Sequence, residues 1–89
     1  MPLVVIPVYD HEHAIGAMVE GVLAAGEDCL LVDDGSGAEC ARELDRLAAL
    51  HAPRVSLLRL PRNGGKGAAV IAGFREAARR GATHALQID

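Results

Sequence analysis

Apolar residues along the chain fall into four short runs, separated by three longer stretches with helical spacing. The first two runs are apolar on both faces, which is typical of central strands in a parallel sheet. Ser56 and Arg59 interrupt the third run, which favours an edge position for it. Strands that alternate with helices form parallel sheets with right-handed crossovers, so we predict a Rossmann-like α/β fold with strand order 3-2-1-4 and three helices. The predicted strands are Leu3–Val8, Asp28–Asp33, Val55–Leu60 and Thr83–Ile88.

The three longer stretches each carry an apolar stripe whose members are three and four residues apart. We expect Asp10 to cap the first helix and Gly26 to end it. Ser36 and Glu39 have the spacing of a capping box for the second helix, and the third should run from about Lys66 to Arg80. The residues expected to face inward are Ile15, Met18, Val19, Val22 and Leu23 in the first helix, Cys40, Leu44, Leu47, Ala48 and His51 in the second, and Val70, Phe74, Ala77 and Ala78 in the third.

Composition narrows the possible classes of protein. Hydrophobic residues make up 51% and charged residues 24%, as in a soluble globular domain. Aromatic residues make up only 2%, which argues against a protein that binds nucleic acid by base stacking. No run approaches the roughly 18 apolar residues of a membrane span, and the start lacks the basic region of a signal peptide. Cys29 and Cys40 form no metal-ligand pattern, so we expect buried free thiols and a reduced, cytoplasmic compartment.

The net charge of −3 is unevenly distributed along the chain. Residues 1–50 carry a net charge of −8 and residues 51–89 a net charge of +5. Two interpretations follow. The two halves can neutralise each other across the folded surface, or a basic wall can face an acidic wall in a crevice suited to a metal–phosphate ligand.

Polar clusters follow each predicted strand. They are Tyr9-Asp10, Asp33-Asp34, Arg62-Asn63 with Lys66, and Asp89. The carboxyl ends of parallel strands share one edge of the sheet, where open α/β folds bind their ligands. Adjacent carboxylates also require a cation or hydrogen-bond donors to be held together. The four clusters therefore favour a nucleotide-binding crevice at this edge.

The run Asn63-Gly64-Gly65-Lys66-Gly67 precedes the third predicted helix. Backbone N–H groups at a helix start, together with a lysine, favour an anion; a solvated glycine-rich turn is the alternative. The run is not a P-loop, because Gly67 stands where that motif needs Ser or Thr. His11, Glu12 and His13, at the start of the first predicted helix, are better explained as a surface turn than as metal ligands, because residues two apart face different directions there.

Four motifs in order, at the usual spacings, resemble the opening of a family 2 glycosyltransferase, and most closely its dolichyl-phosphate mannosyltransferase-like branch. They are Val5-Ile6-Pro7-Val8-Tyr9, Val32-Asp33-Asp34-Gly35-Ser36, Asn63-Gly64-Gly65-Lys66-Gly67-Ala68-Ala69 and Gln87-Ile88-Asp89. The resemblance covers the whole chain. Each motif is weak alone, whereas the four together are specific.

The resemblance implies that residues 1–89 are the N-terminal, nucleotide-sugar-binding half of a GT-A fold. The reaction it implies is an inverting, metal-dependent (Mg²⁺ or Mn²⁺) transfer of a sugar from a UDP- or GDP-linked donor to an acceptor such as a polyprenyl phosphate or a glycan. It also implies a cytoplasmic location, with the inner membrane face as an option for the full-length protein. By position, Pro7 and Tyr9 would border the base and ribose, Val32 and Asp34 would meet the base, Lys66 would lie near the base or diphosphate, and Asp89 would be the first acid of a D-x-D motif that binds ribose and metal.

The chain departs from the family pattern at several points. It has Asp10 where the family commonly has Asn, and His11 where this branch often has Glu. The second D-x-D acid, a catalytic base and an acceptor site are absent, so we expect a fragment that is inactive alone. Two other classes remain open. A receiver-like signalling domain would need an acid after the third strand, where Leu60-Pro61-Arg62 stands. A non-catalytic nucleotide-binding module would use the acids only as solvated caps.

Overall fold

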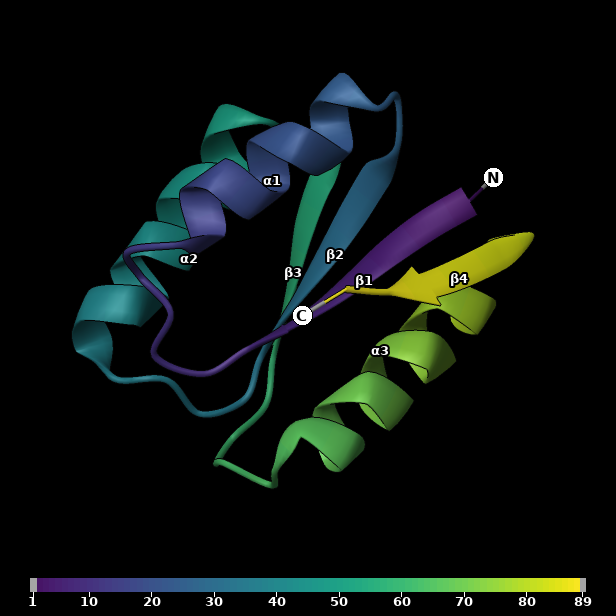
Figure 1. The fold of residues 1–89 in the computed structure, drawn as a ribbon. Helices are drawn as coiled ribbons and strands as arrows, with labels where there is room; N and C mark the ends of the chain where they lie inside the picture. The colour runs from purple at the N-terminus through teal and green to yellow at the C-terminus, as the bar shows by residue number, and fades with distance from the viewer. Residues whose placement is uncertain (1, 89) are drawn as a thin grey trace.

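The chain forms a four-stranded parallel sheet in the order β3-β2-β1-β4, as predicted (Figure 1). The computed structural model describes residues 2–88. Each predicted strand is present with bounds within one residue of those expected, and β3 lies at an edge. The elements are β1 (Pro2–Val8), α1 (Ile15–Ala24), β2 (Asp28–Asp33), α2 (Ala38–Leu50), β3 (Val55–Arg59), α3 (Lys66–Arg79) and β4 (His84–Gln87).

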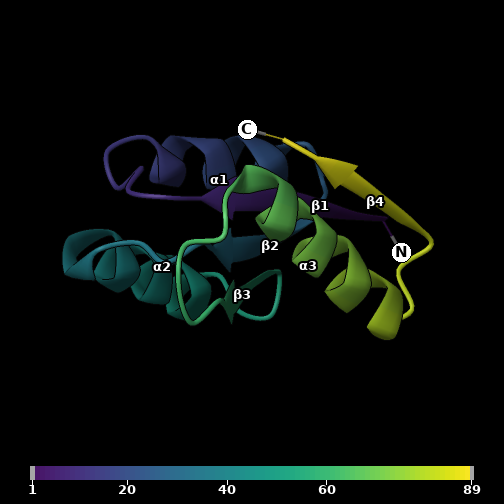
Figure 2. The ribbon, with the colours of Figure 1, turned by 90° about the horizontal axis from the view of Figure 1, so that it is seen from below.

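The helices form a layer on each face of the sheet. Helices α1 and α2 cover one face and α3 covers the other (Figures 1 and 2). This follows from the strand order: the chain moves from β1 to β2 to β3 in one direction, then returns past β1 to β4. With right-handed crossovers, the change of direction sends α3 to the opposite face.

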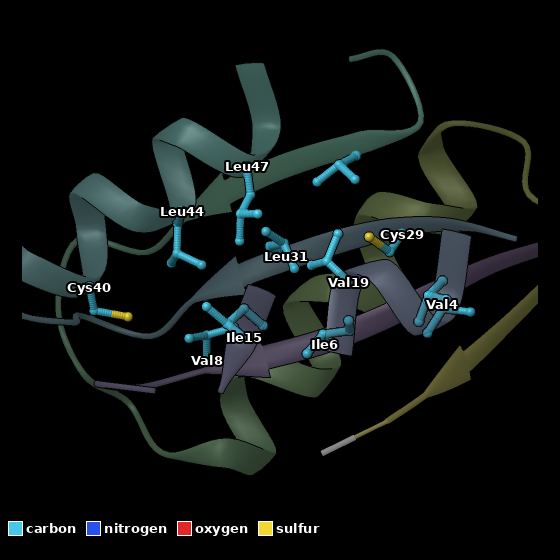
Figure 3. Packing of buried hydrophobic residues seen from close by; sticks show 12 residues of the cluster. Val4, Ile6, Val8, Ile15, Val19, Cys29, Leu31, Cys40, Leu44 and Leu47 are labelled. Atoms are coloured by element: carbon cyan, nitrogen blue, oxygen red, sulfur yellow. The ribbon is translucent and has the colours of Figure 1, made fainter. Parts of the chain in front are cut away.

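Large aliphatic side chains fill the space between the sheet and helices α1 and α2. Ile15, Val19 and Leu44 are at most 1% exposed and pack on Ile6 and Leu31 of the central strands (Figure 3). The predicted stripes of α1 and α2 therefore face inward, although Met18, Leu23, Ala48 and His51 are only partly buried. Both cysteines are buried free thiols, as expected.

Helix α3 approaches the sheet through small residues instead. Its buried positions are Ala69, Gly73 and Ala77. A Cβ atom on Gly73 would overlap Val5 Cγ1 and lie 3.0 Å from Val32 Cγ2, so the helix backbone lies directly on the sheet. The expectation that Phe74 and Ala78 face inward is wrong, since both are exposed. Because the backbone of α3 lies against the sheet, only small side chains fit between the two. The hydrophobic pattern of the sequence does not show how closely a helix approaches the sheet, so it did not predict this choice of residues.

The predicted N-terminal caps of α1 and α2 are wrong, whereas Gly26 ends α1 as predicted, since it follows the C-cap Ala25 and has a φ of +82°. Helix α1 begins after Ala14 and α2 after Gly37, and neither start has a side-chain cap. Instead, Asp10 Oδ1 accepts a hydrogen bond from the Gly37 amide at 2.7 Å, and Ser36 Oγ accepts one from the Asp10 amide at 3.0 Å. The loops after β1 and β2 leave adjacent strands at the same edge, so these side chains join loop to loop.

Candidate nucleotide-binding site

A pocket of about 430 Å³ opens at the carboxyl edge of the sheet, where the sequence predicts ligand binding. Its walls come from the end of β1 and the loop after it, from the end of β2, and from the turn that starts α3. This is the edge at which α1 and α3 depart to opposite faces, the position where open α/β sheets bind nucleotides. The lining residues are Pro7, Val8, Tyr9, His11, Asp34, Asn63, Gly65 and Lys66.

Asp34 joins two loops at the base of this pocket. The residue is only 3% exposed, and its amide donates to Val8 O at 2.8 Å. Its carboxylate receives hydrogen bonds from the Gly64 amide (2.8 Å, to Oδ1), the Gly65 amide (3.0 Å, to Oδ2) and Asn63 Nδ2 (3.2 Å, to Oδ2). Hydrogen bonding thus compensates the burial of this charge without a cationic partner among these contacts.

Gly35 brings the two loops into backbone contact. It has a φ of +77°, which favours glycine. A Cβ atom here would overlap the backbone nitrogen of Asn63 and lie 2.8 Å from the carbonyl carbon of Arg62. No larger residue fits between the loops without moving one of them.

Asp33 points to different partners. It is 1% exposed, and its carboxylate accepts hydrogen bonds from the Ser36 amide at 2.9 Å and from Arg59 Nε at 2.8 Å. Burial alone would raise the pKa of Asp33, but the hydrogen bonds from Arg59 and Ser36 outweigh it and hold the pKa below its ordinary value. The hydrogen bond to Asp33 also raises the pKa of Arg59. Asp33 therefore stays ionised and fastens the end of β2 to β3.

The structure brings together four of the six residues predicted to bind the nucleotide. Pro7, Tyr9, Asp34 and Lys66 all line the pocket. The side chain of Val32 is fully buried under α3 and is not part of the lining. Asp89 lies outside the described residues. Their assigned contacts with base, ribose and diphosphate remain predictions.

Four lining residues were not predicted as nucleotide contacts: Val8, His11, Asn63 and Gly65. His11 was assigned to a surface turn, and it is exposed, but it also lines the pocket. Asn63 was placed only in a polar cluster, whereas its amide reaches Asp34 O at 3.0 Å as well as the carboxylate. His11 and Asn63 each lie within four residues of the carboxyl end of a strand, and this position in the sequence could have indicated them.

The uneven charge is partly neutralised by ion pairs between the two halves of the chain. Arg54 pairs with Asp28, and Arg59 pairs with both Asp33 and Asp45. These contacts support mutual neutralisation at β2 and β3. Lys66 lines the pocket and brings a cationic side chain to it.

Residues 2–88 contain no group of three or more side chains able to hold a metal ion. Asp33 and Asp34 both use their carboxylates to accept hydrogen bonds within the fold. The described residues therefore do not form the metal centre that the family resemblance implies, and the predicted ligand Asp89 lies beyond them. Within the same residues, no helix has the length and apolar character needed to cross a membrane.

Comparison with known protein families assigns the chain to a family. The model of the family described as "Glycosyl transferase family 2" matches residues 3–80. The chain belongs to this family. The predicted family is thus confirmed, while the match does not specify a branch within it.

Similar proteins include three undecaprenyl-phosphate 4-deoxy-4-formamido-L-arabinose transferases. The one from Pectobacterium carotovorum subsp. carotovorum (strain PC1) is 36% identical over 80 residues, which is 83% of this chain and 24% of the relative. The one from Proteus mirabilis (strain HI4320) is 34% identical over 80 residues, with the same coverage of 83% and 24%. The one from Pseudomonas fluorescens (strain SBW25) is 34% identical over 79 residues, which is 82% of this chain and 23% of the relative. The chain thus spans about a quarter of the length of these relatives.

Proposed function

We propose that this chain is the donor-nucleotide-binding part of an inverting glycosyltransferase. The donor would be a UDP- or GDP-linked sugar and the acceptor a polyprenyl phosphate, with a glycan as the alternative acceptor. One observation carries the proposal: a pocket at the carboxyl edge of the sheet gathers Pro7, Tyr9, Asp34 and Lys66, the residues to which the family resemblance assigns nucleotide contacts. The names of the relatives include undecaprenyl phosphate, which supports a polyprenyl phosphate acceptor and the dolichyl-phosphate mannosyltransferase-like branch.

The chemistry of the pocket suits one end of a nucleoside diphosphate. Pro7 and the half-exposed ring of Tyr9 offer apolar surface to a base and ribose. Lys66, at the first position of α3, brings a positive charge to the lining of the pocket, where a helix start also favours anions. Asp34 lines the same pocket, with its carboxylate bonded to the turn that precedes α3, and Asp89 stays the proposed metal ligand.

Transfer of the sugar requires groups that residues 2–88 do not supply in this pocket. A carboxylate must deprotonate the acceptor, and the family's divalent metal (Mg²⁺ or Mn²⁺) would stabilise the departing diphosphate. The carboxylates of Asp33 and Asp34, at the end of β2, accept hydrogen bonds that hold the fold together. We therefore propose that the chain binds the donor nucleotide but does not turn it over alone, and that the full-length enzyme works in the cytoplasm at the inner membrane face.

Titration of the chain with UDP and GDP, with and without Mn²⁺, tests this function. Calorimetry measures the affinity, and the fluorescence of Tyr9 reports on the pocket, because the chain has one Tyr and no Trp. Lys66→Met should weaken binding about tenfold or more, which corresponds to about 1.4 kcal/mol. Arg75→Met removes one positive charge from the exposed surface of the same helix and should leave the affinity unchanged.

Two results would contradict this function. One is the absence of saturable binding of either nucleotide by the unmodified chain. The other is an equal loss of affinity in the Lys66 and Arg75 variants, which would indicate non-specific attraction to positive charge.

A further inference from the structure

We propose that the outer face of α3 docks on the surface of a membrane that contains anionic lipids. This face is formed by six exposed residues, which are Ala68, Ile71, Phe74, Arg75, Ala78 and Arg79. Binding to lipid would not require a nucleotide. Its consequence for sugar transfer rests on the proposed function.

Helical spacing places these six residues on the half of α3 that points away from the sheet. The helix contacts the sheet through residues four positions apart, which are Ala69, Gly73 and Ala77. Within the part of the chain that the structure describes, α3 alone covers its face of the sheet, so nothing lies over its outer side (Figure 2). Two large apolar side chains are open to solvent there: Ile71 is 54% exposed and Phe74 is 38% exposed.

The helices on the two faces of the sheet carry opposite charge. Helix α3, with its C-cap Arg80, has four basic residues and one acid, whereas α1 and α2 together have four acids and two basic residues. The acid of α3, Glu76, accepts hydrogen bonds from both Arg79 and Arg80. Arg75 is exposed and forms no ion pair with the residues that the structure describes. The fold therefore gathers much of the positive charge of residues 51–89 on one side of the molecule.

This separation of charge gives binding a direction. The chain as a whole has a net charge of −3, so an anionic surface repels its acidic side. The same surface attracts the basic face of α3, and each arginine or lysine near anionic lipid contributes to that attraction. An anionic membrane would therefore hold the chain in one orientation, with α3 toward the lipid.

The mixture of apolar and basic side chains favours a lipid surface over other polyanions. Ile71 and Phe74 can enter the boundary between headgroups and acyl chains, while the neighbouring Arg75 and Arg79 meet lipid phosphates. A nucleic acid would use the positive charges alone and would leave the two apolar side chains in water. The charge complementarity and the exposed apolar residues thus point to the same partner.

Docking through α3 would bring the nucleotide pocket close to the membrane. Lys66 is the first residue of α3 and also lines the pocket. The helix has 14 residues and is therefore about 21 Å long, so a helix that lies along the lipid surface keeps the pocket at its amino end near the headgroups. This position suits a donor site whose proposed acceptor is a polyprenyl phosphate.

Cosedimentation with vesicles tests the docking surface. Vesicles of phosphatidylcholine with about 30% phosphatidylglycerol should bind the unmodified chain in about 0.05 M NaCl, and binding should weaken at least tenfold in about 0.5 M NaCl. Arg75→Glu should lower the vesicle affinity at least tenfold, and Ile71→Gln should lower it about fivefold. Circular dichroism checks that both variants keep the fold, since neither residue is buried.

Two matched controls lie on the other side of the sheet. Arg42→Glu changes the net charge by the same amount as Arg75→Glu, at an exposed position of α2. Leu86→Gln removes an apolar side chain that is 58% exposed, close to the value for Ile71, but Leu86 lies beside Met18 and Val22 on the side of α1. Both control variants should bind the vesicles as the unmodified chain does, within about twofold.

Several results would overturn the docking surface. They are the absence of binding to the anionic vesicles, equal binding to vesicles of phosphatidylcholine alone, and equal losses in Arg42→Glu and Arg75→Glu. Unchanged vesicle binding in Ile71→Gln, together with equally tight binding of heparin, would show a general site for polyanions and would also overturn it.

Nucleotide titrations contain no lipid, so the docking surface and the proposed function can fail separately. Arg75→Met should keep its affinity for UDP and should lose about fivefold in vesicle affinity. Vesicle binding without UDP binding would disprove the proposed function and would support α3 as the membrane-facing surface. UDP binding without vesicle binding would disprove the docking surface alone.

Discussion

The two ends of β2 are built from the same residue types but in different surroundings. At the amino end, Asp28 pairs with Arg54 at 3.1 Å, and Gly26 has a φ of +82° two residues before it. At the carboxyl end, Asp33 pairs with Arg59 at 2.8 Å, and Gly35 has a φ of +77° two residues after it. Arg54 also donates to the carbonyls of Leu23 and Glu27, and Arg59 donates to the carbonyl of Ala41 in α2.

The difference lies in burial and crowding. The side chain of Asp28 is 36% exposed and that of Asp33 is 2% exposed. A Cβ atom on Gly26 would meet nothing within 4 Å, whereas one on Gly35 would overlap the loop that starts at Arg62. The amino end therefore only closes a turn, while the carboxyl end interlocks two loops and shapes a pocket. Similar residues at the two ends should respond very differently to the same substitution.

The largest effect is expected for Gly35→Ala. The left-handed conformation costs a Cβ-bearing residue about 1–2 kcal/mol, and displacement of the 62–65 loop adds about 1–3 kcal/mol. We expect the free energy of unfolding to fall by about 3 kcal/mol in urea denaturation, with loss of UDP binding. Gly26→Ala has the same conformational cost and no overlap, so about 1 kcal/mol and unchanged binding are expected. Equal losses in the two variants would show that crowding at the carboxyl end is unimportant.

The second effect is the loss of the buried carboxylate in Asp33→Asn. Breaking a fully buried pair costs about 3–5 kcal/mol, but Arg59 is 42% exposed and can be hydrated, so we expect about 2 kcal/mol. Asp28→Asn removes a pair in which both side chains are at least 36% exposed and should cost under about 1 kcal/mol. Urea denaturation at pH 7 measures both. A larger loss at Asp28 would reverse the assigned roles of the two ends.

The same pair predicts the response to acid. The pKa of Asp33 is lower in the folded chain than in the unfolded chain, since hydrogen bonds from Arg59 and Ser36 outweigh burial. Its contribution is therefore complete above the unfolded pKa of about 3.9 and is lost as the pH falls through the lower, folded pKa. The stability difference between the unmodified chain and Asp33→Asn should be constant from about pH 5 to 7 and should shrink below about pH 4. A difference that does not shrink at all as the pH falls below about 4 would contradict the assignment of a lowered pKa to Asp33.

The features that could be predicted from sequence are those set by local pattern and chain direction. Uniform apolar runs identified β1 and β2, and the position of Arg59 indicated an edge strand. The strand order followed because right-handed crossovers allow few arrangements. The pocket was predicted at the carboxyl edge of the sheet because the four polar clusters each follow a predicted strand, and parallel strands end at the same edge.

The features that could not be predicted depend on contacts between distant residues. Ser36 and Asp10 have the sequence of helix caps, but they bond to each other's loops across 26 and 27 positions. Asp34 lies about thirty positions from the turn that it holds. Phe74 was expected inward because it belongs to the apolar stripe of the third predicted helix, whereas the close approach at Gly73 leaves room only for small residues. In each case the tertiary contact decides the outcome, and a local pattern carries no information about it.

The smallest effect is expected for the contact between Arg59 and Asp45. It tests whether burial, rather than charge pairing, distinguishes the two ends of β2. Arg59 Nη1 lies 3.2 Å from Asp45 Oδ1, and the Asp45 side chain is 58% exposed. This contact belongs to the carboxyl end by position but resembles the Asp28–Arg54 pair in exposure. Asp45→Asn should therefore lower the free energy of unfolding by no more than about 0.5 kcal/mol, and the loss should vanish in about 0.5 M NaCl. Arg59 would keep its contacts with Asp33 and Ala41 O. A loss above about 1 kcal/mol that persists in salt would show that Arg59 needs both carboxylates and that the network at this end acts as one buried unit.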